Sequence, residues 1–302
     1  MTALRSRLPA IPPLLDRWLP ALVVLTAAAG LAAPAPGRFL DTHAGIPLVL
    51  AMLVLTAGTS VQPASLHQLR AGLPALALIV AASTLTLPAL AWLASRLVTD
   101  PALRHGVLAS GVAPAEVATV ALAARAGTDT ALTALLLITS TVATVALAGP
   151  VLDLLAGATA HIGVVALMGT LALIVALPLA LGIAARTRWP HATPLHTTAP
   201  TIGNLALLVL VFLVTAQIPH DTAYLPVIPA LLAYLAASAA LGWALARLVA
   251  AGRRRAVLLP VAMRDFAVAA GIADTAFGHA AAAPLGTYGI LVLLFGSLVS
   301  RR

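Results

Sequence analysis

Ten long apolar stretches, joined by short connections, make up most of this sequence. A helix needs about 20 mainly apolar residues to cross a bilayer, and each stretch has roughly that length or more. The 302 residues are 61% hydrophobic and 9% charged. Soluble domains carry about 25% charged residues, so this chain has too few to cover a water-exposed surface. We therefore predict an all-α integral membrane protein, with residues 1–302 forming a single transmembrane domain.

The positions of the arginines predict how the ten helices are oriented. The helices are expected near residues 18–36, 44–62, 71–97, 102–126, 128–155, 161–185, 200–218, 222–250, 256–278 and 280–300. All 17 basic residues are arginines; with the N-terminus inside, 13 fall on the cytoplasmic side, 3 fall on the other, and Arg264 lies within a predicted helix. This bias follows the positive-inside rule. We expect a multi-pass protein of a bacterial-type cytoplasmic membrane with both termini in the cytoplasm.

An internal repeat is predicted from the number of helices. Ten helices divide into two sets of five, and an odd number per set places the sets in opposite orientations, as in many secondary transporters. The repeats would cover about residues 18–155 and 161–300. A short echo supports the division: "VAPAEVA" begins at Val112 in the fourth helix, and "VAMRDFA" begins at Val261 in the ninth. In this alignment Glu116 corresponds to Asp265.

Three charged residues, Glu116, Arg264 and Asp265, lie in the middle of predicted membrane helices. Such residues are costly in a bilayer, face the protein interior and usually mark a pathway or a site. Pro114 precedes Glu116 by two residues and Pro260 precedes Arg264 by four, and proline interrupts helical hydrogen bonding. We predict breaks in the fourth and ninth helices at a substrate or ion site. The alternative is an ion pair that only locks two kinked helices together, with Asp265 capping backbone.

Hydroxyl and amide side chains in the apolar stretches give a second set of candidates. In the fifth helix several hydroxyls recur at a spacing that places them on one helical face, and one follows Glu116 by three residues. They either line an ion site or a substrate path, or bond to their own helix and pack between helices. One asparagine in the seventh helix either faces a cavity or bonds a neighbouring helix. These residues are Thr119, Thr133, Ser140, Thr141, Thr144 and Asn204.

Several other functions are not expected. The chain has no cysteine, and its histidines lack the spacing of metal ligands, so we predict neither a metal site nor a cofactor. Motifs for a serine nucleophile or a phosphate loop are absent, which argues against an enzyme. The arginines form no basic patch interleaved with aromatic residues, so nucleic acid is not an expected partner. The expected partners are the lipid bilayer and a small solute, and the sequence predicts no oligomeric state.

Three segments resemble the bile acid/sodium symporter superfamily. "GVAPAEVATVALAARAGTDTALTALLLITST" (111–141) is similar to its fourth-to-fifth-helix region, "AVLLPVAMRDFAVAAGIA" (256–273) to its ninth-helix break, and "AAAPLGTYGILVLLFGSL" (281–298) to its last helix. The resemblance implies an inverted repeat whose broken fourth and ninth helices cross in a core of helices 3–5 and 8–10. Helices 1–2 and 6–7 would form a panel. It also implies sodium-coupled uptake of organic anions such as bile acids, carboxylates or sulfonates; relatives include arsenite exporters.

The sequence departs from this family at the residues that matter for sodium. Sodium-coupled members have a glutamate and, four residues later, Gln-Asn, where this chain has Pro260, Arg264 and Asp265. They have Ser-Asn where it has Thr119 and valine, whereas the hydroxyl at Thr133 is kept. A hard cation needs several oxygen ligands, so sodium binding in its usual form is doubtful.

We interpret Arg264 as a tethered charge in place of a bound cation. It would pair with Glu116 or Asp265 at rest and attract an anionic substrate. The function predicted on this basis is secondary active transport of a small organic anion by alternating access. The alternatives are a proton-coupled or uncoupled transporter or exporter of the same superfamily, since two acids and one arginine leave room for a proton, or a membrane sensor that does not transport.

Overall fold

A computed structural model describes residues 12–43, 45–60, 73–157, 163–189, 193–218 and 224–301. Within these ranges the regular structure is helical, apart from one isolated β-bridge. Six of the described helices are long and apolar enough to cross a membrane, or up to seven if one bent pair counts as a single span. The chain is therefore an α-helical, multi-pass membrane protein. A helix or a pair of helices lies over each of the ten predicted ranges, but breaks divide several of them into pieces too short to count.

The first two predicted helices are described as three elements. Helix α1 (Pro12–Ala32) and helix α2 (Pro34–Asp41) meet at a bend of 93°. The bend follows from Pro34, which starts α2 and forces the residue before it out of the helical conformation. Helix α3 (Gly45–Ser60) follows.

The next three predicted helices contain the first break. Helix α5 (Leu73–Ser95) is continuous, and α6 (Pro101–Val112) begins at an Asp100 cap whose side chain accepts a hydrogen bond from the Leu103 N–H. The chain then leaves the helical conformation and resumes as α7 (Ala118–Arg125) and α8 (Thr130–Ala156). Ala113, which precedes Pro114, is extended with ψ of 154°, as the residue before a proline usually is. The predicted break therefore lies at Pro114.

The sixth and seventh predicted helices are nearly as expected. Helix α9 (Val164–Leu171) passes through a π-helical turn at Ala172–Ala176 into α10 (Leu177–Arg188), and α11 (Thr193–Thr215) follows. A Cβ atom on Gly58 of α3 would lie 2.5 Å from the carbonyl oxygen of Leu179, so glycine allows α3 and α10 to pack backbone to backbone. Small residues serve such close approaches in membrane helices.

The last three predicted helices contain the second break. Helix α12 (Val227–Leu245) leads through short 3₁₀ turns to α13 (Arg254–Ala262), and the chain continues as α14 (Phe266–Phe277) and α15 (His279–Val299). The break does not lie at Pro260, because α13 continues for two residues beyond that proline. It lies at Met263–Asp265, so that Arg264 stands in the break itself.

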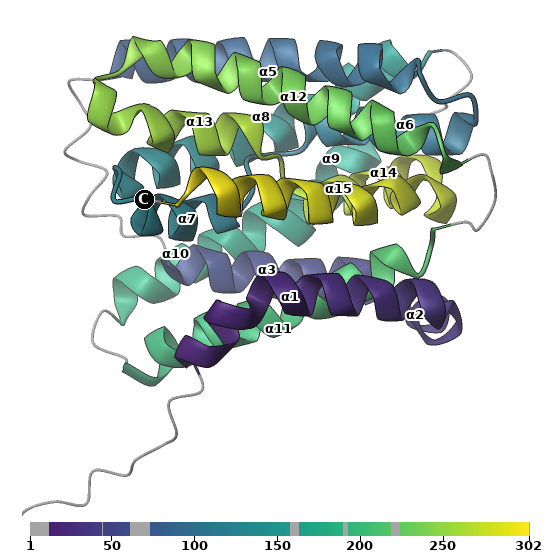
Figure 1. Ribbon diagram of the computed structural model, residues 1–302, viewed down its shortest axis with the longest axis horizontal. Helices are drawn as coiled ribbons and strands as arrows, with labels where there is room; N and C mark the ends of the chain where they lie inside the picture. Colours follow the sequence, from purple (N-terminus) through teal and green to yellow (C-terminus); the bar gives the residue numbers. More distant parts are fainter. Residues whose placement is uncertain are drawn as a thin grey trace, which may run out of the picture.

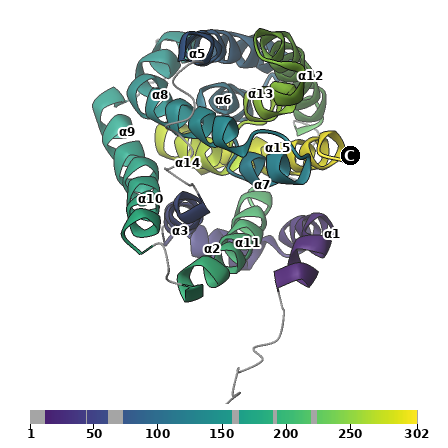
Figure 2. The same cartoon turned by 90° about the vertical axis from the view of Figure 1, so that its left-hand side faces the viewer.

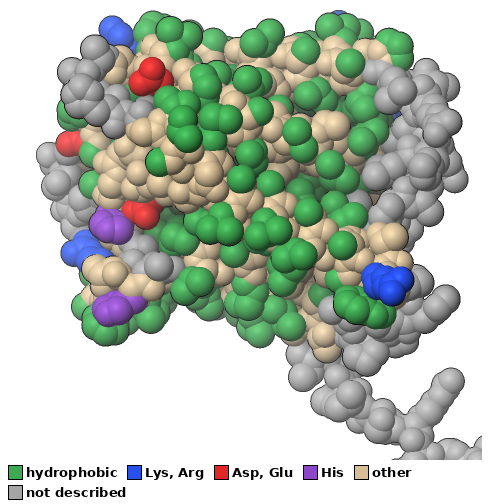
Figure 3. All heavy atoms as spheres, turned by 180° about the vertical axis from the view of Figure 1, so that it is seen from behind, with side chains coloured by type: hydrophobic (Ala, Val, Ile, Leu, Met, Phe, Trp, Pro, Cys, Tyr) green, Lys and Arg blue, Asp and Glu red, His purple; other side chains and the backbone are tan. Residues whose placement is uncertain are grey.

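The helices form two groups, which are clearest end-on in Figure 2. One group contains α5–α8 and α12–α15; the other contains α1–α3, α10 and α11, while α9 packs against α8 and α14. Most helices run roughly parallel, along the horizontal direction of Figure 1. On the face shown in Figure 3, apolar side chains cover the middle and charged side chains lie toward the ends, as expected for a bilayer-spanning surface.

Candidate functional site

The two breaks pair with each other. The Glu116 N–H donates to the Met263 carbonyl at 2.9 Å, and the Asp265 N–H donates to the Pro114 carbonyl at 2.8 Å. Ala115 and Arg264 form the antiparallel bridge between them. These are equivalent positions of "VAPAEVA" and "VAMRDFA", so the two segments meet through a local two-fold relation. Backbone groups that a break would leave unpaired in the membrane thereby bond to each other.

The central amide of each break is also paired, each time by a hydroxyl of the second helix after that break. The Ala115 N–H donates to Ser140 Oγ of α8 at 3.0 Å. The Arg264 N–H donates to Tyr288 Oη of α15 at 3.3 Å. Tyr288 was not predicted as a site residue. The signal that could have found it is a tyrosine in a stretch that is otherwise apolar, since a buried tyrosine hydroxyl usually has a partner.

The guanidinium of Arg264 binds carbonyl oxygens at the C-terminal ends of α6 and α13, the two helices that stop at the breaks. Its guanidinium is buried and donates from Nε to the Ala113 carbonyl at 2.8 Å, from Nη2 to the same oxygen, and from Nη1 to the Pro260 carbonyl at 3.5 Å. These oxygens lie at the C-terminal ends of α6 and α13, where helices carry partial negative charge. The predicted pairing of Arg264 with Glu116 or Asp265 was wrong: within the described residues the guanidinium forms no ion pair with either carboxylate. The unpaired carbonyls of the broken helices hold it instead.

Asp265 caps the N-terminus of α14. Its Oδ1 accepts hydrogen bonds from the N–H groups of Ala267 and Val268, both at 2.9 Å. A carboxylate at this end of a helix offsets the partial positive charge there. Its Oδ2 is buried and has no hydrogen-bond partner among the described residues. Asp265 thus caps backbone, as the alternative prediction stated, and keeps one acceptor unused.

Glu116 holds the equivalent position at the start of α7. Its Oε1 accepts a long bond of 3.4 Å from the Ala118 N–H, and its Oε2 is buried without a partner in the described part of the chain. The side chain is 2% exposed and lies within electrostatic range of Asp265. We call the place where the two breaks pair with each other the crossing. Two carboxylates and one guanidinium lie there, and each carboxylate has one oxygen with no hydrogen-bond partner among the described residues.

A cavity of about 650 Å³ lies beside the crossing, between the two groups of helices. Among the described residues that line it, Glu116 and Arg125 are charged, and Thr56, Thr130, Asn204 and Ser297 are neutral and polar. The rest of the lining is apolar and comes from α1, α3, α7, α8, α11 and α15. Arg264 and Asp265 do not belong to the lining. Of the three buried charges at the crossing, Glu116 is therefore the one that faces the cavity.

The hydroxyls singled out in the sequence bond to backbone and stay out of the cavity lining. Thr119 donates to the Glu116 carbonyl at 2.5 Å, and Thr141 donates to the Leu137 carbonyl of its own helix at 2.8 Å. Ser140 donates to the same Leu137 oxygen at 2.9 Å, and Thr144 donates to the Val112 carbonyl at the first break at 2.9 Å. Asn204, in contrast, lines the cavity.

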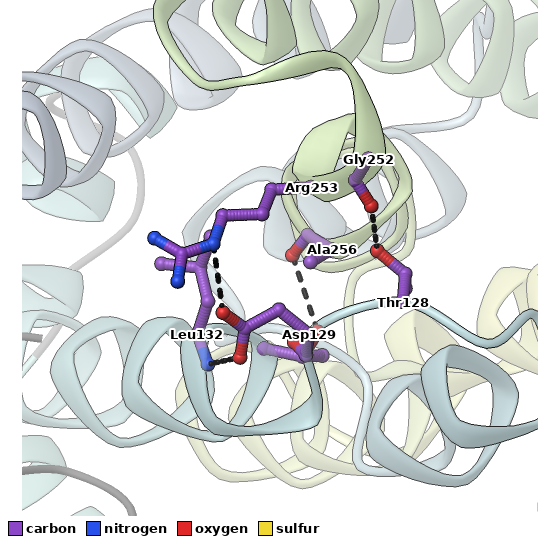
Figure 4. A network of polar contacts seen from close by, with 7 residues as sticks. Thr128, Asp129, Leu132, Gly252, Arg253 and Ala256 are labelled. Atoms are coloured by element: carbon purple, nitrogen blue, oxygen red, sulfur yellow. Dashed lines mark hydrogen bonds and ion pairs between the residues drawn. The ribbon is translucent and has the colours of Figure 1, made fainter. Parts of the chain in front are cut away.

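Thr133 compensates for a proline. Pro260 has no N–H to donate to the Ala256 carbonyl four residues earlier. Thr133 Oγ1 lies 3.3 Å from that oxygen and 3.0 Å from the Asp129 carbonyl of its own helix, so its one proton serves both acceptors. Around it, Thr128 Oγ1 donates to the Gly252 carbonyl at 2.9 Å, and Arg253 pairs with Asp129 at 3.0 Å (Figure 4). This network joins the start of α8 to the start of α13. Thr133 therefore supports the second broken helix rather than the cavity.

The comparisons with known proteins identify the family. Residues 47–224, more than half of the chain, match the sodium bile acid symporter family. The chain belongs to this family. The match includes the first break and confirms the resemblance drawn from the sequence, and it ends before the second break. No curated protein matches the chain.

Proposed function

We propose that this chain is a secondary active transporter that carries a small organic solute with an anionic group across the membrane by alternating access. The observation that carries the proposal is the reciprocal pairing of two helix breaks beside a cavity of about 650 Å³. Transporters bind their cargo where broken helices leave backbone and charge in mid-membrane. Membership of the symporter family supports the same function.

The architecture we propose is ten transmembrane helices in two inverted repeats. The equivalent residues of the two seven-residue segments that face each other across the crossing support this symmetry. The core would consist of α5–α8 and α12–α15, and the panel of α1–α3 and α9–α11. The cavity lies between these two groups, where a movement of one against the other would change its access.

The cavity is proposed to open to the cytoplasm. Its lining comes mainly from the first halves of α1, α8 and α11, from the second halves of α3 and α15, and from the whole of α7, which ends at Arg125. In the orientation predicted from the arginines, these helix halves and the end of α7 lie toward the cytoplasmic side. The first described residues of α1 and the C-terminus lie at the same end of the molecule in Figure 1. This orientation supports an inward-facing state in a cytoplasmic membrane.

A proton is the coupling ion that the charges favour. Arg264 stands where a cation would stabilise the carbonyl ends of α6 and α13, and its fixed charge would repel sodium there. The two carboxylates Glu116 and Asp265 each keep an oxygen with no hydrogen-bond partner among the described residues. With one guanidinium for two buried acids, binding one proton neutralises the crossing. We propose that this proton binds at Glu116, which faces the cavity, and that Arg125 meets the anionic group of the solute.

Transport by purified protein in liposomes tests the proposal. Uptake of cholate, octanoate and octanesulfonate is measured under an imposed pH gradient or an imposed sodium gradient. We expect at least one solute to respond to the pH gradient and none to depend on sodium. Glu116→Gln should lower the pH-driven initial rate by about tenfold or more. Asp153→Asn, which removes an exposed carboxylate of α8 away from the cavity, should not.

Uptake driven by sodium and insensitive to pH would contradict this coupling. If no solute is taken up under either gradient, the transport function itself is contradicted, and a membrane sensor becomes the better interpretation. Because Gln and Glu have the same shape, the elution profile of the detergent-solubilised variant separates a loss of coupling from a loss of folding.

A further inference from the structure

One carboxylate of the cavity lining, that of Glu116, has a buried oxygen that lacks a donor. Glu116 Oε2 has no hydrogen-bond partner in the described part of the chain, although only 2% of the residue is exposed. An ionised carboxylate only accepts hydrogen bonds. Leaving such a group unpaired in a buried site is costly, so the oxygen favours a proton or a donating group of a ligand. The cavity supplies the space for that ligand, because Glu116 belongs to its lining.

The charges around Glu116 do not favour the binding of an anion at this carboxylate. The nearest fixed cation of the crossing, Arg264, donates to the Ala113 and Pro260 carbonyls and does not line the cavity. The nearby acid, Asp265, caps α14. A carboxylate or sulfonate placed against Glu116 would meet like charge without a compensating cation. The part of the solute that reaches the crossing should therefore be a donor.

The opposite charge lies at the other end of the same short helix. Glu116 stands at the start of α7 and Arg125 is its last residue, and both line the cavity. At 1.5 Å of rise per residue the two ends of this helix are about 12 Å apart. The α7 residues between them that line the cavity are apolar: Val117, Ala118, Val120, Ala121, Leu122 and Ala124.

We propose that the solute is bipolar, with an ammonium or similar donating group at the Glu116 carboxylate, an apolar body along α7, and a carboxylate or sulfonate near Arg125. The inference rests on the proposed function only in taking this cavity as the solute site. It specifies a substrate class, an amphipathic molecule whose opposite charges are separated by about the length of α7, roughly 12 Å. Simple organic anions would be poorer ligands.

The proposal also defines how a proton and the solute interact. One carboxylate oxygen cannot hold a proton and an ammonium group together, so the two compete for Glu116. The ammonium displaces the proton that neutralised the empty site, and the released proton passes to solvent through the cavity. Competition for one group makes the transporter an exchanger of solute for protons.

Binding to the detergent-solubilised full-length protein tests the inference. The probes are 8-aminooctanoate, octanoate, octylamine and 4-aminobutyrate, which vary the two end groups and the distance between them. We expect 8-aminooctanoate to bind about tenfold more tightly than each of the other three, a difference of about 1.4 kcal/mol. Its affinity should rise from acid to neutral pH, as the competing proton is lost.

Matched variants assign the two ends. Glu116→Gln should remove both the advantage of the amino group and the pH dependence, and Arg125→Gln should remove the advantage of the carboxylate. Asp153→Asn and Arg301→Gln change exposed residues outside the cavity lining and should leave the order unchanged.

Two outcomes would overturn the inference. One is 8-aminooctanoate binding no better than octanoate, including the case in which neither binds. The other is the same order of affinities in Glu116→Gln as in the unmodified protein. The measurement needs no transport, so an intact order of affinities without uptake into liposomes would contradict the proposed function alone. Proton-driven uptake of octanoate with no preference for the amino compound would contradict this inference alone.

Discussion

The break between α6 and α7 and the break between α13 and α14 share a backbone and differ in their side chains. Each donates one N–H to the other, and each has its central amide bonded to a hydroxyl of the second helix after the break. The first break places alanine at its centre, and the second places Arg264 there. The two breaks therefore share the same backbone pairing, although they carry different side chains.

The surroundings of the two breaks explain the difference. Residues 261–270 of the second break are all buried, and the charges there are used to satisfy helix ends. The first break adjoins the cavity through Glu116, whose Oε2 has no partner in the described residues. One break is thus buried and contains its own cation, and the other contributes a carboxylate to the lining of the cavity.

The largest effect is expected from Arg264→Gln, which removes the fixed cation of the closed break. The Ala113 and Pro260 carbonyls then lose a charged donor. Each such hydrogen bond contributes about 1.5–3 kcal/mol, so the melting temperature should fall markedly. If the guanidinium replaces a bound cation, sodium should raise the melting temperature of this variant and leave that of the unmodified protein unchanged. The measurement is thermal unfolding in sodium and in choline salts.

A conservative variant provides the control for this prediction. Arg264→Lys keeps the charge and loses the planar fork, so it should be destabilised less than Arg264→Gln and should not respond to sodium. Equal destabilisation of the two variants would show that geometry, and not charge, is what the crossing needs. A sodium response in the unmodified protein would contradict the tethered-cation interpretation.

A smaller effect is expected from removing the two hydroxyls that pair the central amides. Ser140→Ala and Tyr288→Phe each leave one buried N–H without its partner. An unsatisfied buried donor costs about 1–3 kcal/mol, and the local two-fold relation predicts similar losses in unfolding free energy for both variants. Denaturation in a mixed micelle would measure them. A loss confined to one variant would show that the two breaks are not equivalent in energy.

The fold was more predictable than the site. Apolar length predicted a helix over each of ten ranges, and Pro114 predicted the first break, because these signals are local. The distant partners of Arg264 and Thr133 were not predictable, since they are carbonyls more than 120 residues away in sequence: 151 for Ala113 and 123 for Ala256. The packing of six helices decides which charged residue lines the cavity, and the sequence pattern of a single helix cannot predict how six helices pack.

The smallest effect is expected where a hydroxyl serves only its own helix. Thr141 donates to the Leu137 carbonyl four residues earlier and does not line the cavity, whereas its neighbour Ser140 bonds the first break. In Thr141→Val that carbonyl keeps its helical N–H donor, so we expect a change below the roughly 0.6 kcal/mol typical of hydrogen bonds between membrane helices. Uptake in liposomes should also be unchanged. A loss of uptake in Thr141→Val comparable to that in Glu116→Gln would mean that the hydroxyl face of α8 belongs to the transport path. The path of the solute would then include this face of α8 as well as the break that contains Glu116.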